Sequence, residues 1–192
     1  PDVPRGIVPF SVADMDFLPP PELSEGVQDF MQGRVFGYTR TPREYIAAFR
    51  RWMQRRHGVD IPDRWVVDAD SVLGAMHRMI RCFTRPGDGI VVMTPAYPPF
   101  LDAPEPLERR RLDCPMCLGA DRRYTIDFAL LETLCRREDT TMLILCNPHN
   151  PVGRVWTRDE LEQVADICLR HGVFIIADEI HADLILPGHS FV

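Results

Sequence analysis

The alternation of short apolar runs with amphipathic helical segments constrains the fold of this chain most. The runs 89–94, 142–146 and 173–177 have the length and composition of buried strands. A helix with clear boundaries lies between the last two, from the capping box Thr157-Arg-Asp-Glu160 to a stop at Gly172. Because parallel strands need long crossovers, the pattern predicts an α/β fold with three layers, α/β/α, and a mainly parallel sheet.

The same start and stop signals predict the remaining elements. A first helix should begin near Pro21 and end by Gly33, with a buried face formed by Leu23, Val27, Phe30 and Met31. A second should begin at a capping box, Thr41-Pro-Arg-Glu44, and end at Gly58. Further helices are expected at 71–83 and 127–135, and further strands at 65–68 and 107–112.

Charge and hydropathy exclude several classes of protein. The formal net charge of -6 argues against a general nucleic-acid or anionic-membrane surface. No apolar run reaches the roughly 18 residues of a membrane span, and the first residues lack a signal-peptide pattern. We therefore expect a cytoplasmic protein with neither nucleic-acid nor membrane partners.

The six cysteines indicate reduced thiols. Four of them fall within apolar helix or strand patterns, where cysteine acts as a small core residue. Cys114-Pro-Met-Cys117 would form a redox pair only at the start of a helix that follows a strand, and a zinc site only with a second close pair. We expect no metal site.

Polar residues gather where the predicted strands end. Ser71-Val-Leu-Gly74 opens a helix, so the backbone N–H groups of Val72 and Leu73 suit a phosphate, although Ser71 also fits an ordinary N-cap. Tyr97 follows one strand and could stack on a flat ring or simply pack in its loop. Asn147-Pro-His-Asn-Pro-Val-Gly153 follows the next strand, and Asp178 with His181 follows the last. Ligands of open α/β sheets bind at this edge.

Asp178 is the most informative of these residues. It ends an apolar run, so its carboxylate needs a cationic partner, which could be a protonated pyridine nitrogen, a metal, an arginine or a helix N-terminus. The segment Phe174-Ile-Ile-Ala-Asp-Glu-Ile-His181 resembles the DExH box of helicases. A helicase would also need an upstream Gly-Lys-Ser/Thr phosphate loop, and this sequence contains no lysine.

A second resemblance covers nearly the whole chain. It is carried in order by Val12-Ala-Asp-Met-Asp-Phe17, Gly37-Tyr38, Tyr97-Pro-Pro-Phe100, Asn147-Pro-His-Asn-Pro-Val-Gly-Arg-Val-Trp156 and Asp178-Glu-Ile-His-Ala-Asp183. These motifs resemble fold-type I pyridoxal-phosphate enzymes, most closely the PatB/MalY branch of the class I/II aminotransferases. The resemblance implies an N-terminal arm and part of a small domain over 1–36, and the first part of a large cofactor-binding domain over 37–192.

The resemblance also implies roles for individual residues. Asp178 would pair with the pyridine nitrogen of pyridoxal 5'-phosphate, and Asn150 and His181 would bind the 3-oxygen of its ring. Tyr97 would stack on the ring, and the backbone of Val72 and Leu73 would hold the phosphate. Within an implied homodimer, Tyr38 would reach the phosphate of the partner subunit. The backbone of Ala13 would lie near the carboxylate of the amino-acid substrate.

The activity implied by this branch is C–S β-lyase activity. The enzyme would cleave cystathionine or a related sulfur amino acid to a thiol, pyruvate and ammonia. A class I/II aminotransferase is the alternative, and a noncatalytic binding remnant is a third reading because the chain has no lysine to form the cofactor's Schiff base. We expect that lysine after Val192, so the chain is interpreted as the N-terminal part of a longer enzyme and contains no catalytic residue of its own.

Overall fold

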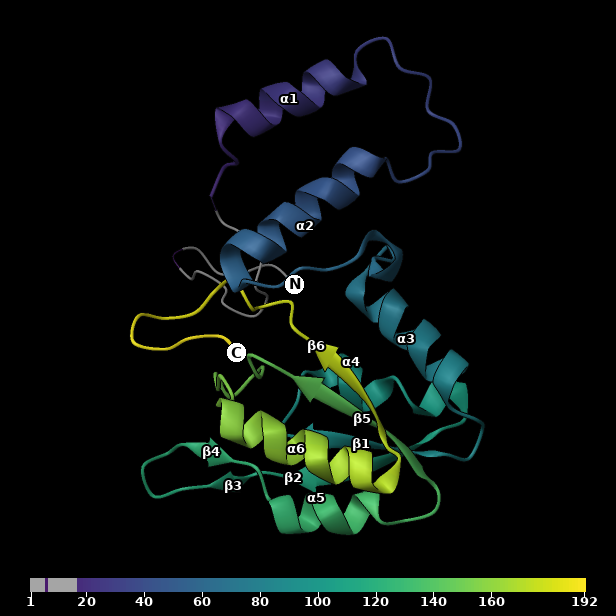
Figure 1. The fold of residues 1–192 in the computed structure, drawn as a ribbon, viewed down its shortest axis with the longest axis vertical. Coiled ribbons are helices and arrows are strands. Elements are labelled where there is room, and N and C mark those ends of the chain that lie inside the picture. The colour runs from purple at the N-terminus through teal and green to yellow at the C-terminus, as the bar shows by residue number, and fades with distance from the viewer. Residues whose placement is uncertain (1–5, 7–16) are drawn as a thin grey trace. The chain divides into compact units, whose positions relative to one another are not determined.

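The computed structural model describes residue 6 and residues 17–192. The chain divides into two compact units, Pro1–Arg40 and Thr41–Val192. The described part of the first unit contains one helix, α1 (Pro21–Met31; Figure 1). Its bounds confirm the predicted helix, but the predicted burial is wrong, because none of its residues is buried and all four of the named side chains are exposed. The helical period identifies an apolar face without identifying what covers it.

A four-stranded parallel sheet forms the centre of the second unit. The spatial order is β2 (Arg110–Pro115), β1 (Gly89–Thr94), β5 (Thr140–Cys146) and β6 (Phe174–Asp178). Strands β1 and β5 are buried along almost their whole length, as expected for central strands covered on both faces. A short antiparallel pair, β3 (Cys117–Leu118) and β4 (Tyr124–Thr125), lies outside this sheet.

Helices cover both faces of the sheet (Figure 1). Alternate residues of β1 and β5 face α5 (Phe128–Cys135) and α6 (Arg158–His171) in one apolar core. The remaining residues of these strands face α3 (Val72–Phe83) and α4 (Pro98–Asp102) in a second core. Two cores separated by one parallel sheet confirm the predicted three-layer α/β/α architecture.

The local signals at helix ends were mostly reliable. The capping box of α6 is complete, since Glu160 N–H donates to Thr157 Oγ1 at 3.2 Å and Thr157 N–H donates to Glu160 Oε2 at 2.8 Å. Gly172 ends that helix in the left-handed conformation, with φ of 68°. Asp127 caps α5 by accepting a hydrogen bond from Leu130 N–H at 2.9 Å. These contacts need only neighbouring residues, which is why the sequence predicts them.

Three predicted features are wrong or displaced. The proposed capping box at Thr41 does not form, because Thr41 Oγ1 donates to Asp68 Oδ2 at 2.6 Å and α2 (Arg43–His57) begins after Pro42. The proposed strand at 65–68 is absent from the described structure, where a 3₁₀ turn, η1 (Asp63–Trp65), is followed by unpaired extended chain. Strand β2 begins at Arg110 instead of 107, because the 3₁₀ turn η2 (Glu105–Leu107) precedes it.

The cysteines behave as core residues. Four of the six are buried and none forms a disulfide. Cys114 lies in β2 and Cys117 in β3, so the pair does not open a helix, and burial raises the pKa of the Cys114 thiol to about 12. Within residues 17–192, no group of His, Cys, Asp and Glu side chains has the arrangement of a metal site. No helix in the same part of the chain is long and apolar enough to cross a membrane.

Candidate functional site

The carboxyl ends of β1, β5 and β6 meet at one edge of the sheet, because these strands are parallel neighbours (Figure 1). Tyr97 follows β1, Asn150 follows β5, and Asp178 is the last residue of β6. The site predicted from the sequence requires these strands to be adjacent, and β1, β5 and β6 are adjacent in the sheet. The sheet therefore brings three of the predicted site residues to a common edge.

The turn after β5, residues 147–156, is fixed by its own buried groups. Asn147 Oδ1 accepts a hydrogen bond from Trp156 N–H at 3.1 Å, and Trp156 Nε1–H donates to Cys146 O at 2.9 Å. Asn147 N–H in turn donates to Asp178 O at 2.9 Å. These bonds close the turn on itself and join it to the end of β6, so Asn150 is presented on a rigid support.

His149 joins the same turn to the loop after β1. Its Nε2 lies 2.9 Å from Pro95 O, two residues before Tyr97, and its backbone N–H donates to Arg154 O at 2.7 Å. Burial lowers the pKa of His149 below its ordinary value of 6.5, so the ring is neutral and Nε2–H is the donor. Sequence reasoning did not select this residue. The one feature of the sequence that could have indicated it is a single histidine between two prolines, in a turn that follows a buried strand.

Asp178 is a buried carboxylate with little local compensation. The residue is 7% exposed, and its Oδ1 accepts one hydrogen bond, from Ile180 N–H at 3.0 Å. In residues 17–192 no arginine or histidine forms an ion pair with it. Burial, together with the negative charge of Asp178, raises the pKa of the neighbouring Cys146 thiol to about 11. A cationic group of a ligand would supply the partner that this carboxylate lacks.

The N-terminus of α3 points to the same edge. Phe83 at the end of α3 stacks on Phe174 at the start of β6, with ring centroids 4.5 Å apart, so the helix runs antiparallel to the strand. Ser71 Oγ accepts from Gly74 N–H at 3.0 Å, and Ser71 O accepts from Ala75 N–H at 2.9 Å. Ser71 is thus an N-cap, while the N–H groups of Val72 and Leu73 have no protein acceptor in the described contacts and remain available to an anion.

The other predicted residues are less constrained. Tyr97 precedes α4, is 38% exposed, and its ring meets Phe100 edge-on at a centroid distance of 5.4 Å. Asn150 and His181 are half-buried, and His181 lies in the turn that follows β6. Tyr38 belongs to the first unit and is fully exposed. Ala13 lies outside the described residues.

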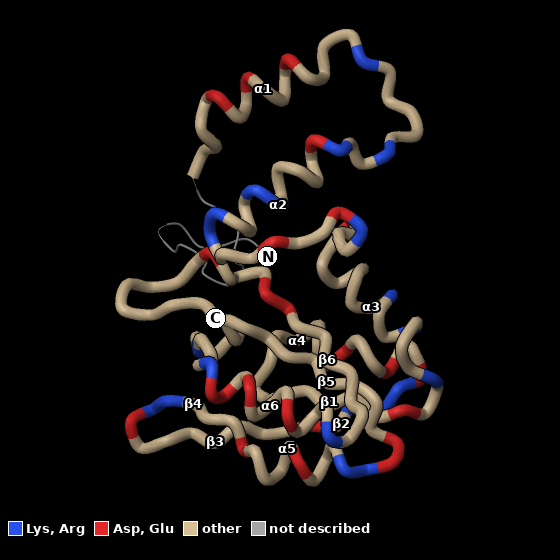
Figure 2. Tube along the Cα trace, viewed as in Figure 1, with Lys and Arg blue, Asp and Glu red and all other residues tan. Residues whose placement is uncertain are grey.

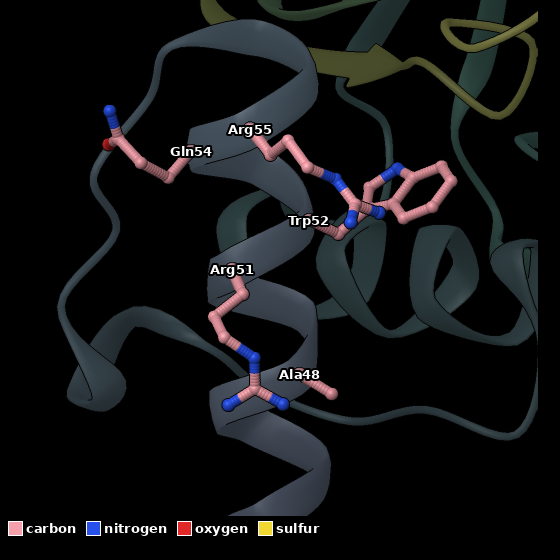
Figure 3. A pocket seen from close by; sticks show the side chains of 5 residues that line it. All are labelled: Ala48, Arg51, Trp52, Gln54 and Arg55. Carbon is pink, nitrogen blue, oxygen red and sulfur yellow. The ribbon is translucent and has the colours of Figure 1, made fainter.

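A separate hollow of about 600 Å³ lies along α2, and the described residues that line it all belong to that helix (Figure 3). Its lining consists of Ala48, Arg51, Trp52, Gln54 and Arg55. The guanidinium carbon of Arg55 lies 5.2 Å from the centre of the Trp52 ring, so one of the two arginines is engaged with an aromatic face. None of the predicted site residues that the structure describes lines this hollow.

Comparison with known proteins finds relatives that match nearly the whole of this chain. The chain is 41% identical over 183 residues to cystathionine beta-lyase PatB of Bacillus subtilis and 37% identical over 180 residues to the protein MalY of Escherichia coli. These alignments cover 95% and 93% of this chain but 47% and 46% of the relatives. The chain thus spans about half the length of the curated relatives it matches.

Solved structures agree in fold. Cystalysin from Treponema denticola, whose crystal structure contains a pyridoxal 5'-phosphate cofactor, superposes with a TM-score of 0.92 at 43% identity, over 96% of this chain and 47% of the other. A pyridoxal-phosphate-bound C-S lyase from Staphylococcus hominis superposes with a TM-score of 0.88 at 29% identity, over 94% of this chain and 46% of the other. A sequence model of aminotransferase class I and II matches residues 5–192, nearly the full length. The chain belongs to the aminotransferase class I and II family.

Proposed function

We propose that the protein is a pyridoxal-phosphate-dependent C–S β-lyase that converts cystathionine or a related sulfur amino acid to a thiol, pyruvate and ammonia. One observation carries the proposal: Asp178 is a buried carboxylate that has no cationic partner among residues 17–192, and it lies at the edge where parallel strands place ligands. The name of a relative at 41% identity supports this reaction class, since PatB is a cystathionine beta-lyase.

The residues at the sheet edge fit this cofactor. When bound, pyridoxal phosphate withdraws electrons from the substrate's α carbon and so eases loss of the α proton. The Asp178 carboxylate would hold a proton on the pyridine nitrogen, an ion pair that also removes the cost of burying a lone charge. Tyr97 would cover one ring face, Asn150 and His181 would bind the 3-oxygen, and the N–H groups of Val72 and Leu73 would hold the phosphate.

The proposal extends to features that require more than this chain. Tyr38 of one protomer would reach the phosphate bound by its partner in a homodimer, and the backbone of Ala13 would bind the substrate carboxylate. The activity needs an amine to hold the cofactor, and a lysine after Val192 in the whole protein is part of the proposal. We further propose a cytoplasmic enzyme, with reduced thiols as the supporting observation.

Aminotransfer is the second candidate, favoured by the description of the family itself. The two reactions differ in whether a β leaving group departs. The full-length protein should release pyruvate from cystathionine without a keto-acid acceptor. Turnover that requires an acceptor would instead establish the aminotransferase, and failure to bind pyridoxal phosphate would favour the noncatalytic alternative.

Substitution of Asp178 tests the residue that carries the proposal. Asp178→Asn removes the charge at the same size, so pyruvate release should fall on the order of 10²-fold. Asp166→Asn is the matched control, because this exposed side chain lies on α6 and forms no ion pair or hydrogen bond in the described structure. Equal activity of Asp178→Asn and the control would refute the assignment of Asp178.

A further inference from the structure

Asp183 joins the turn after β6 to the end of α2. Its Oδ2 accepts a hydrogen bond from Trp52 Nε1–H at 2.8 Å, and its Oδ1 lies 2.9 Å from His57 Nε2. The donors precede Asp183 by 131 and 126 residues, so this is a tertiary link. Arg56 adds a longer ion pair, with its Nε 3.8 Å from Oδ1, and Figure 2 shows the basic last turn of α2.

The link is shielded from solvent at its His57 end, whereas the Asp183 side chain is 39% exposed. The side chain of His57 is 12% exposed, and the ring of Phe191 meets it edge-on at a centroid distance of 5.6 Å. Two donors on separate oxygens of one carboxylate fix its orientation, which a single exposed ion pair does not do. Asp183 therefore has a defined position relative to α2.

The turn between Asp178 and Asp183 is short and internally bonded. Ile180 N–H donates to Asp178 Oδ1, and Ala182 N–H donates to Glu179 O at 2.9 Å. Leu184 N–H donates to His181 O at 2.9 Å. Strand β6 fixes one end of the turn, and among the described contacts the only side-chain hydrogen bonds that reach it from another element are those to Asp183.

We propose that Asp183 is a positioning residue: by accepting hydrogen bonds from Trp52 and His57, it anchors the turn 179–184 on α2 and sets the position of His181 relative to Asp178. The inference rests on the proposed function, because His181 needs a fixed position only if it binds a ligand beside Asp178. The residue itself does not touch the ligand and acts through His181.

Hydrogen exchange of the full-length protein without added cofactor tests the anchor. In Asp183→Ala the two anchoring hydrogen bonds are absent, so local opening of the turn costs less free energy. The amides of Ala182 and Leu184 should therefore exchange about tenfold faster or more. Asp183→Asn should lie between, because its amide oxygen can still accept from Trp52. Asp166→Ala is the control and should not change exchange in 179–184. Unchanged exchange in Asp183→Ala would overturn the proposal.

Trp52→Phe keeps a ring and removes one donor, so it replaces Asp183→Ala if that variant does not fold. The same increase in exchange, at smaller size, is expected from it. Exchange that rises equally throughout the sheet would show general destabilisation and would also overturn the proposal.

A double-mutant cycle on cofactor affinity tests whether Asp183 acts through His181. Asp183→Ala and His181→Ala should each weaken pyridoxal-phosphate binding about tenfold, and the double variant should be no weaker than His181→Ala alone. Additive losses, about 100-fold in the double variant, would overturn the proposed route. If the wild type binds no pyridoxal phosphate, the proposed function fails and so does the role of His181, whereas the exchange experiment still decides whether Asp183 anchors the turn.

Discussion

The turns that follow β5 and β6 leave the same sheet edge but are held in different ways. The turn after β5 is part of the core: Trp156 is fully buried, and Asn147 and His149 are buried. Their hydrogen bonds lie within the turn or reach the ends of β5 and β6 and the loop after β1. The turn after β6 has the exposed side chains Ile180 and Leu184, and its side-chain bonds to another element run to α2.

This difference separates two ways of building a binding site. The position of Asn150 is set when the core folds, because its turn cannot change without exposing buried groups. The position of His181 depends on one carboxylate and two distant donors, so it can change without global unfolding. The proposed cofactor site would thus have a rigid side, formed by the turn after β5. Its other side, formed by the turn after β6, would become mobile after a single substitution.

The largest predicted effect comes from breaking the buried turn. Trp156→Ala should lower the free energy of unfolding by about 3–5 kcal/mol, because it leaves a cavity and removes the hydrogen bond to Cys146 O. Urea denaturation measures this loss. Trp65→Ala is the matched control: Trp65 is 67% exposed, and its removal should change stability by about 0.5 kcal/mol or less. Comparable losses in the two variants would contradict the assignment of the turn to the core.

A smaller effect should appear as a pH dependence of stability caused by His149. The folded ring has a lowered pKa, so below its ordinary value of 6.5 the unfolded chain binds a proton that the folded chain does not. The stability that His149 contributes is therefore complete above that value and is lost as the pH falls toward the folded pKa. His149→Gln keeps a donor for Pro95 O and removes this titration.

Urea unfolding of the wild type and His149→Gln at several pH values measures the difference. The wild type should lose stability relative to the variant as the pH falls below the ordinary histidine pKa of 6.5, and the difference should stay constant at higher pH. A difference that is constant through the acid range, or that grows in favour of the wild type, would show that His149 is not a buried neutral imidazole.

Sequence signals predicted the elements whose causes are local. Strand β1 and the ends of α6 have the predicted bounds, because an apolar run, a Thr/Glu capping box and a left-handed glycine act within a few residues. The predictions failed where distant residues decide. Thr41 bonds to Asp68 instead of capping α2, and the β-prone residues at 65–68 have no neighbouring strand with which to pair.

The same distinction applies to the candidate site. Because β1, β5 and β6 are parallel neighbours, Tyr97, Asn150 and Asp178 lie at one edge of the sheet. The alternation of strands and helices in the sequence predicts this arrangement. His149 and Asp183 were not selected, because their partners lie 54 and more than 120 residues away and no local pattern marks them. Side chains that connect elements are visible only in the folded chain.

The smallest predicted effect tests the other half of the comparison. Leu184 is large and apolar but 77% exposed in the turn after β6, so Leu184→Ser should change the free energy of unfolding by about 0.5 kcal/mol or less. Ile176→Ser, at a buried position of β6, is the contrasting variant and should cost several times more, because it places an unpaired hydroxyl in the core. A loss above about 1 kcal/mol for Leu184→Ser would mean that another group covers this side chain. The turn after β6 would then be packed like the turn after β5, and Asp183 would no longer be needed to explain how His181 is held.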